Sequence, residues 1–184
     1  MSLRKFRILQ MIFTSFIFVG TFIFFLSTTK FQISEIQLSY WGIDDNFGWA
    51  WNSCLMMLSL SMFFNVAHFI HTHPRLQFKK EIILTFLVVC MFLFLTGLAP
   101  MHNPAHKTVA WFYFLTYPLA IFTFVALNYK NLPHKEWLGH LLISTSLVIL
   151  PVVSMRFTGL AIPETIHSVL ILGWNLYICK NKTY

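Results

Sequence analysis

The sequence predicts an all-α, polytopic membrane protein in which six transmembrane helices form one domain over residues 1–184. Hydrophobic residues make up 57% of the chain and charged residues only 10%, whereas charged residues make up about a quarter of a soluble domain. No Pro-, Ser- or Gly-rich stretch divides the chain into two halves, and no internal repeat is visible. The composition therefore argues against a soluble fold and indicates a single membrane domain.

Six apolar segments are each long enough to cross a bilayer, because a helix rises about 1.5 Å per residue and the hydrocarbon core is about 30 Å thick. Arg4, Lys5 and Arg7 precede the first segment, as in a signal peptide, but no small-x-small cleavage site follows and the apolar run is long. We therefore expect the first segment to be kept as a span. The six segments cover about residues 7–28, 48–70, 81–99, 105–128, 137–156 and 162–179.

Residues 29–47 form the one long connection between these segments. Hydrophobic and polar residues alternate imperfectly over residues 33–40, and turn-forming residues follow from Gly42. This pattern predicts a short strand or an interfacial segment that caps the bundle outside the membrane. Three tryptophans are expected at the level of the lipid headgroups: Trp41, Trp49 and Trp51.

Prolines mark helix starts and bends in this sequence. In Asn103-Pro104 the Asn side chain can cap the fourth span while the Pro suits its first turn, and Pro163 has the same position at the sixth span. Pro118 and Pro151 fall inside the fourth and fifth spans, where the missing N–H donor kinks a helix. We expect these bends to leave an apolar cleft that opens to the outer face or sideways to lipid.

The basic residues predict the orientation of the chain. They stand in small groups beside the ends of the spans, so the formal charge of +7 indicates membrane topology and not nucleic-acid binding. Ten of the 13 Lys and Arg residues lie on one predicted side, and only Lys30, Lys107 and Arg156 lie on the other. Because Lys and Arg are concentrated in cytoplasmic loops, both termini are predicted in the cytoplasm.

Three stretches of the chain resemble a known family. They are FGWAWNSCLMMLSL at the start of the second span, LTGLAPMHNPAHKTVAWFYFLTYPLAIF across the third-to-fourth turn, and GLAIPETIHSVLILGW at the start of the last span. In this order they resemble the bacterial six-span membrane proteins of unknown-function family nine-nine-eight, although Met101-His102 replaces the acidic residue typical of that family after its GLxP turn. The resemblance implies a six-span fold in the cytoplasmic membrane of a bacterium and implies no mechanism.

Polar residues from three separate segments are predicted near the outer face. Imidazole and carboxylate side chains are the ligands of zinc and iron and the usual proton carriers. His106, Glu164 and His167 are therefore the candidates for a metal site, with His102 or the Asp44-Asp45 pair as a fourth member, although no metal or other cofactor is firmly implied. The predicted ligand-binding group is Asp44, Asp45, His102, His106, Arg156, Glu164 and His167.

A structural explanation competes with each member of this metal group. His106 in the first turn of the fourth span is expected to have a neutral ring, which suits a ligand, a base or a hydrogen bond to a loop carbonyl. Glu164 and His167 share a helical face as an ExxH unit, but carboxylate-bridged metal bundles need two copies of that unit and this chain has one. Glu164 is also explained by a favourable place in a helix's first turn or by pairing with Arg156.

A second polar group is predicted toward the cytoplasmic side and comprises Asn65, His68 and His140. Asn65 and His68 share a face that must avoid lipid. Paired imidazoles on two helices can hold haem, but no second pair is evident, and a hydrogen bond between helices is the other explanation. Three cysteines without CxxC or Cys/His spacing are expected to pack as small hydrophobic residues: Cys54, Cys90 and Cys179.

The sequence leaves the activity open. The main hypothesis is an integral membrane protein that binds a membrane lipid or other amphiphile in the cleft, and the alternative is an intramembrane enzyme, metal-dependent or not, that modifies a lipid. A small-solute transporter is less favoured, because neither discontinuous helices nor two matching halves are visible. The chain contains no GxSxG, HExxH, Walker or GxGxxG motif, and nothing in it indicates the oligomeric state.

Overall fold

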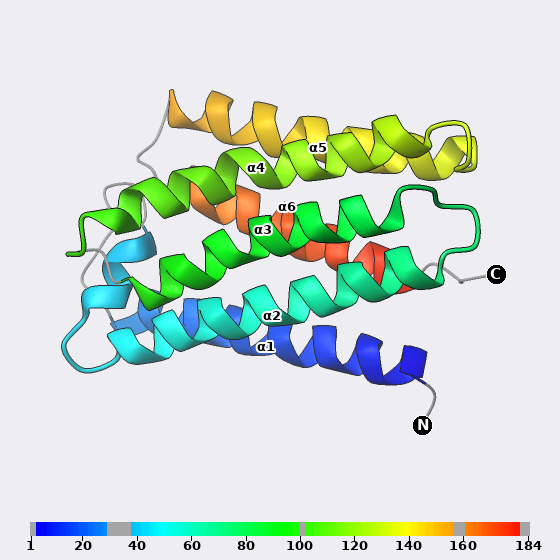
Figure 1. Ribbon diagram of the computed structural model, residues 1–184. Coiled ribbons are helices and arrows are strands. Elements are labelled where there is room, and N and C mark those ends of the chain that lie inside the picture. Colours follow the sequence, from blue (N-terminus) through cyan, green and yellow to red (C-terminus); the bar gives the residue numbers. More distant parts are fainter. Residues whose placement is uncertain (1–2, 29–37, 100–101, 157–160, 181–184) are drawn as a thin grey trace.

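The computed structural model describes residues 3–28, 38–99, 102–156 and 161–180, and the regular structure in these residues is helical (Figure 1). Each of the six predicted segments corresponds to one α-helix. Five of these helices, α1 to α5, are long and apolar enough to cross a membrane, which indicates a multi-pass membrane protein. The helix α6 is less apolar because it carries Glu164, His167 and Asn175. The elements are α1 (Leu3–Thr28), the 3-10 helix η1 (Leu38–Ile43), α2 (Gly48–Thr72), α3 (Lys79–Leu98), α4 (Ala105–Asn128), α5 (His134–Met155) and α6 (Ala161–Lys180).

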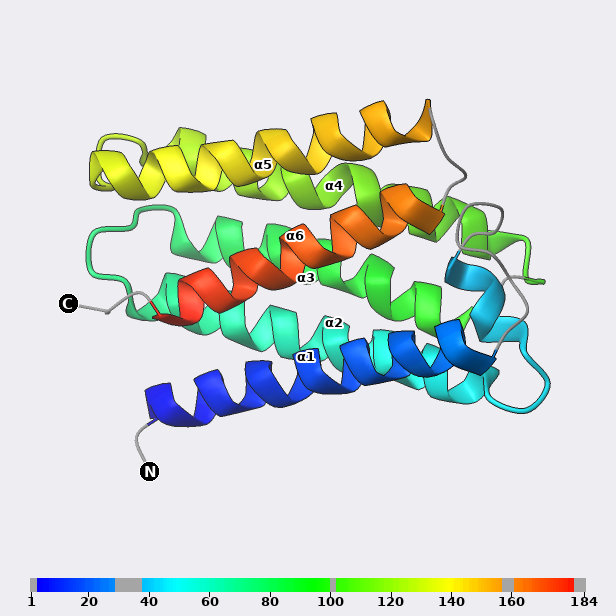
Figure 2. The same cartoon turned by 180° about the vertical axis from the view of Figure 1, so that it is seen from behind.

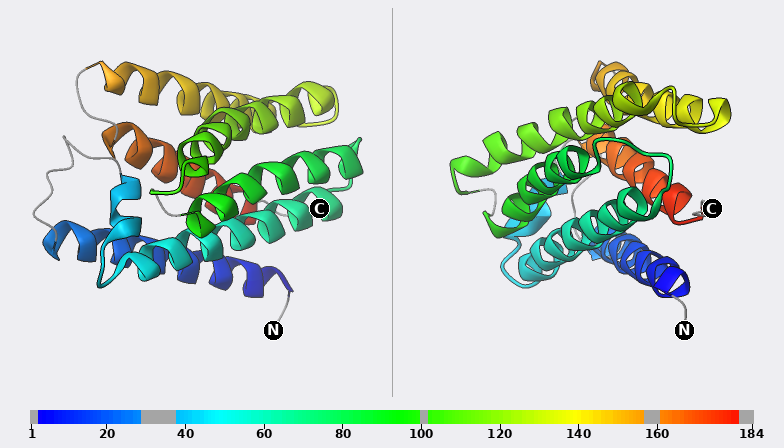
Figure 3. Two further views of the ribbon diagram at one scale, coloured as in Figure 1. Left: turned by 60° about the vertical axis from the view of Figure 1, so that its left-hand side comes forward. Right: turned by 45° about the vertical axis from the view of Figure 1, so that its right-hand side comes forward.

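Consecutive α-helices pack side by side, and α6 closes the bundle by packing against α1 and α2. Figure 2 shows α6 passing between α1 and α5. The start of α1, the end of α6 and the α2–α3 and α4–α5 connections lie at one end of the bundle, called here the terminal end (Figure 1). The 3-10 helix η1 and the starts of α4 and α6 lie at the opposite end, called here the η1 end (Figure 3).

Small and aromatic residues set the packing between the helices. A Cβ atom on Gly97 of α3 would lie 2.6 Å from the backbone oxygen of Asn52, so only glycine allows α2 and α3 to approach this closely. In the core the rings of Phe86 and Trp174 stack at 5.5 Å. Large apolar side chains such as Phe16 and Val152 remain exposed on the outside of the bundle, as expected for a surface that faces lipid.

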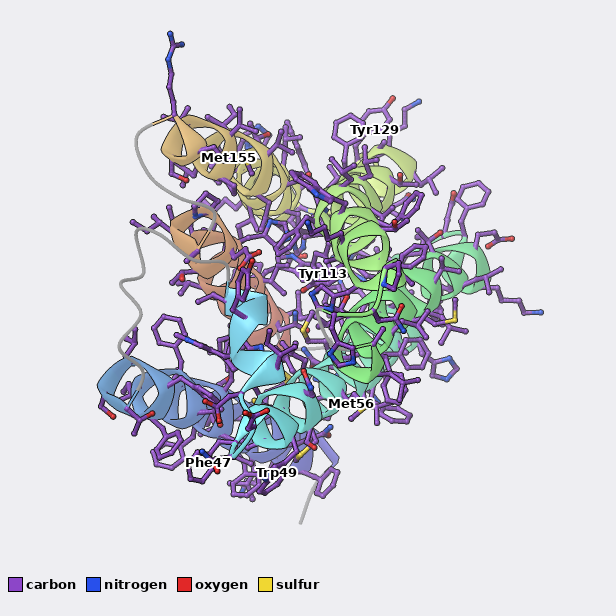
Figure 4. All side chains as sticks on the ribbon, turned by 90° about the vertical axis from the view of Figure 1, so that its left-hand side faces the viewer. Phe47, Trp49, Met56, Tyr113, Tyr129 and Met155 are labelled. Atoms are coloured by element: carbon purple, nitrogen blue, oxygen red, sulfur yellow. The ribbon has the colours of Figure 1, made fainter. Side chains whose placement is uncertain are left out.

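The connection before α2 differs from its predicted form. From Leu38 onward it is the 3-10 helix η1 and not a strand, while residues 29–37 lie outside the described part of the chain. Trp41 of η1 stacks on Phe25 of α1 at 5.2 Å and meets Trp51 of α2 edge-on at 4.9 Å. These aromatic contacts bury Trp41 and Trp51 where η1 packs on α1 and α2, whereas Trp49 is exposed (Figure 4).

The prolines lie close to their predicted positions. The helix α4 begins one residue later than expected, with Pro104 at the cap position, and the side-chain oxygen of Asn103 accepts a hydrogen bond from the Ala105 N–H at 2.9 Å. Pro163 lies in the first turn of α6. The helices α4 and α5 continue through Pro118 and Pro151.

Candidate functional site

A cleft of about 480 Å³ lies between α4, α5 and α6 at the η1 end of the bundle. Pro118 and Pro151 both line it, so a cleft is present where these prolines predicted one. The α4 side chains of its wall extend from His106 to Leu119, about 20 Å along the helix. Because Leu119 and Val152 are also exposed on the outside of the bundle, the cleft reaches the lateral surface between α4 and α5. Its size and apolar wall are typical of small-molecule pockets.

His106 brings an unpaired nitrogen to this cleft from the first turn of α4. Its Nδ1 lies 2.5 Å from the carbonyl oxygen of Ala99 at the end of α3. A carbonyl only accepts, so Nδ1 carries a proton, and Nε2 is an acceptor in the neutral form of the ring. The ring is 3% exposed, and Nε2 is buried without a partner. The expected hydrogen bond to a loop carbonyl is therefore present, and it leaves the other nitrogen available.

His167 of α6 has the same arrangement. Pro151 has no N–H, so the carbonyl of Leu147, four residues earlier, lacks its helical partner. His167 hydrogen-bonds to the backbone of Leu147, and its donor is Nδ1 because its buried Nε2 has no partner. The ring of Phe114 meets that of His167 edge-on at 4.7 Å and helps to fix it. A second bare acceptor therefore belongs to the wall of the same cleft.

Glu164 lies where the cleft meets a second, smaller cavity of about 60 Å³, called here the inner cavity. Its Oε2 accepts a hydrogen bond from the backbone N–H of Leu38 at 2.7 Å, which anchors η1 to α6. His106 also lines both spaces, and Trp51 contributes a buried Nε1–H donor without a partner to the inner cavity. The inner cavity has room for a few water molecules. The cleft therefore has an apolar body and a polar inner end.

Side chains of the fourth and sixth helices are in contact. The ring of Tyr113 on α4 lies 5.8 Å from that of His167 on α6, and Tyr113 lies in the middle of the bundle seen from the η1 end (Figure 4). The Tyr117 hydroxyl accepts a hydrogen bond from Asn175 Nδ2 at 2.8 Å. His106, Glu164 and His167 are therefore brought to one cleft from two helices.

The other members of the predicted group lie elsewhere. His102, Asp45 and Arg156 are exposed and line neither cavity. Asp44 also lines neither, because its Oδ1 accepts hydrogen bonds from the backbone N–H groups of Asn46 and Phe47 just before α2. Within the described ranges, no group of three or more His, Cys, Asp or Glu side chains is arranged to hold a metal ion.

The polar group toward the terminal end forms hydrogen bonds between helices. Asn65 Nδ2 donates to the backbone and side-chain oxygens of Asn175 at 2.9 and 3.2 Å, which joins α2 to α6. His140 Nδ1 accepts from Trp174 Nε1 at 2.9 Å, and His68 is partly buried. Sequence reasoning missed Asn175, although it carries the signal that singled out Asn65, a polar side chain within an apolar run. The three cysteines are free and buried, as predicted.

No family model, curated protein or solved structure matches this chain.

Proposed function

We propose that this protein binds a lipid or other amphiphile, with the apolar chain in the cleft between α4, α5 and α6 and the polar end at His106, Glu164 and His167. The observation that carries the proposal is an elongated apolar cleft that reaches the lateral surface and ends at unpaired buried acceptors. Unpaired polar groups at such a depth are unfavourable. A ligand with a polar end supplies the missing partners.

The proposal includes six membrane spans in the cytoplasmic membrane of a bacterium, with both termini in the cytoplasm. The unequal distribution of Lys and Arg and the resemblance to family nine-nine-eight support it. The start of α1 and the end of α6 lie at one end of the bundle, which agrees with an even number of spans (Figure 1). Although α6 is less apolar than the others, His167 and Asn175 are buried inside the bundle and do not face lipid. The ligand then enters from the outer leaflet.

Filling the cleft tests the binding function. Ala110 lines both the cleft and the inner cavity, whereas Ala126 of the same helix is exposed and lines neither. Ala110→Phe should lower the fraction of purified protein that retains lipid in native mass spectrometry at least tenfold, and Ala126→Phe should leave it unchanged. Equal retention by the two folded variants would place the bound lipid outside the cleft.

A lipid-modifying enzyme is the second candidate, because a neutral Nε2 beside a bound hydroxyl is also what a general base requires. Purified protein would be incubated with phospholipid vesicles, and the molecular masses of the recovered lipids would be measured by mass spectrometry. A new lipid mass that the His167→Phe variant fails to produce would favour the enzyme, and unchanged lipid would favour binding alone. Elemental analysis of the same sample tests the metal-dependent form of this candidate.

A further inference from the structure

The polar end of the cleft offers mainly hydrogen-bond acceptors. His106 Nε2 and His167 Nε2 are both buried acceptors without partners. The Glu164 carboxylate also accepts, and it has one described partner, the N–H of Leu38. Each bare imidazole nitrogen has its tautomer fixed by a backbone carbonyl on the other side of the ring. A ligand that brings several donors on one small group satisfies this arrangement, and an anionic or donor-free group does not.

The charges at the site point the same way. Glu164 is an acidic side chain that lines the inner cavity, and Lys107, next to His106 in the chain, lines the cleft and is exposed. The cleft therefore has an acidic group where it meets the inner cavity and an exposed basic group in its wall. A headgroup with a terminal cation and a phosphate nearer its acyl chains matches this order of charges.

We infer that the ligand, if the proposed lipid-binding function holds, is a phospholipid whose headgroup ends in a primary ammonium. Where the cleft meets the inner cavity, the ammonium has N–H donors for Glu164 and His106 Nε2, which line both spaces, and for His167 Nε2 on the cleft side. Lys107 attracts the phosphate. The inner cavity, at about 60 Å³, gives a small ammonium room at this junction, while a trimethylammonium is bulkier and has no N–H. Trp51 Nε1–H donates to water that remains in the inner cavity.

A methylation series tests this inference on the purified full-length chain in detergent. Phosphatidylethanolamine would be compared by native mass spectrometry with its N-methyl, N,N-dimethyl and choline analogues and with phosphatidylglycerol, all with the same acyl chains. Binding should fall with each added methyl group and be at least tenfold weaker for the choline and glycerol lipids. Equal binding of the choline or glycerol lipid would overturn the inference and leave the proposed function standing. Binding of none of these lipids would overturn both.

Glu164→Gln tests the residue that the ammonium contacts. The Gln oxygen can still accept from the Leu38 N–H, so η1 keeps its anchor while the negative charge is lost. The variant should lose the preference for ethanolamine over choline lipid, and Glu81→Gln, at an exposed site in the first turn of α3, should keep it. A folded Glu164→Gln protein with the original preference would overturn the inference. Should this variant not fold, Lys107→Gln at an exposed site provides a second check, because it should weaken ethanolamine and choline lipids equally. A selective loss of one of them in Lys107→Gln would contradict the assigned order of charges.

Discussion

The two ends of the bundle use buried polar side chains in different ways. Toward the terminal end, Asn65, Asn175, Tyr117 and Cys179 form a connected set of hydrogen bonds among α2, α4 and α6. None of these four residues lines the cleft or the inner cavity. At the η1 end, His106 and His167 each donate one ring N–H to a backbone carbonyl, and the other ring nitrogen borders a cavity.

His140 and His167 make the contrast specific. Both are buried, and both have an Nε2 without a partner. His140 Nδ1 accepts from Trp174, so its Nε2 carries the proton, and the rings of Phe124 and Tyr177 lie around it at 5.1 and 5.5 Å. Aromatic faces accept weak N–H bonds. His167 has the opposite tautomer beside open space, so its Nε2 is an acceptor that a ligand can reach.

The difference teaches that burial alone does not mark a functional polar residue. A polar side chain whose hydrogen bonds are completed by other helices holds the bundle together. One whose free atom borders a cavity stabilises the protein less and is available to a ligand. Substitutions at the two ends should therefore separate stability from binding.

The largest effect on stability is expected for Asn175→Ala. The change removes the Asn175 Nδ2 donor from Tyr117 and the Oδ1 acceptor from Asn65, so the free energy of unfolding should fall by about 2 kcal/mol. Thermal unfolding in detergent measures this loss, and the lipid preference should be unchanged. Asn131→Ala is the control, because the described hydrogen bond of Asn131 uses its backbone N–H. Equal melting temperatures for the two variants would show that the α2–α4–α6 hydrogen bonds contribute nothing.

A smaller effect on stability, with a large effect on binding, is expected for His167→Phe. Phe keeps the ring contacts to Tyr113 and Phe114 and removes a buried unpaired nitrogen, while the bond to Leu147 is lost. These effects oppose each other, so the free energy of unfolding should change by less than about 1 kcal/mol. Retention of ethanolamine lipid should fall at least tenfold. A strongly destabilised variant would move His167 from the binding site to the structural network.

The helices could be predicted from sequence because they depend on local patterns. Apolar runs predicted the bounds of each α-helix to within four residues, and the basic residues grouped Glu164 with the histidines predicted near the outer face. Pro151 also indicated a disturbed carbonyl, although not that His167 would complete it. The hydrogen bond from the Leu38 N–H to the Glu164 carboxylate could not be predicted, because 126 residues separate the two and no local pattern links them.

Some residues of the predicted ligand-binding group line neither cavity, and the reason is physical. Residues predicted on the same membrane face share only a similar depth. The direction in which each side chain points depends on the local backbone conformation. The Asp44 side chain accepts hydrogen bonds from the nearby backbone N–H groups of Asn46 and Phe47, and His102 lies in an exposed turn before α4. The carbonyl of Ala99 that sets the tautomer of His106 has no sequence signature, and Pro151 indicates a free carbonyl at Leu147 without showing which side chain bonds to it.

A still smaller effect concerns pH at the terminal end. His73, just after α2, has a pKa below its ordinary value of 6.5 because burial disfavours the charged ring more than Glu136, at 3.7 Å, favours it. The unfolded chain therefore takes up a proton as the pH falls below about 6.5, while the folded protein resists it, so stability decreases in that range. His73→Phe should remove this part of the pH dependence of thermal unfolding, and His71→Phe at an exposed site should not. A pH profile that His73→Phe leaves unchanged would assign the dependence to other groups.

The smallest expected change is in the position of single protons, and it tests the comparison most directly. Long-range ¹H–¹⁵N correlation spectra of ¹⁵N-histidine-labelled protein should show His106 and His167 protonated at Nδ1 and His140 protonated at Nε2, because a carbonyl accepts from the first two and the Trp174 N–H donates to the third. Single replacements of each histidine by Phe assign the signals. Added phosphatidylethanolamine should shift the Nε2 signals of His106 and His167, since each gains a donor, and leave that of His140 in place. A proton on His167 Nε2 would turn the cleft's acceptor into a donor, and an ammonium would then have no reason to prefer this end of the bundle.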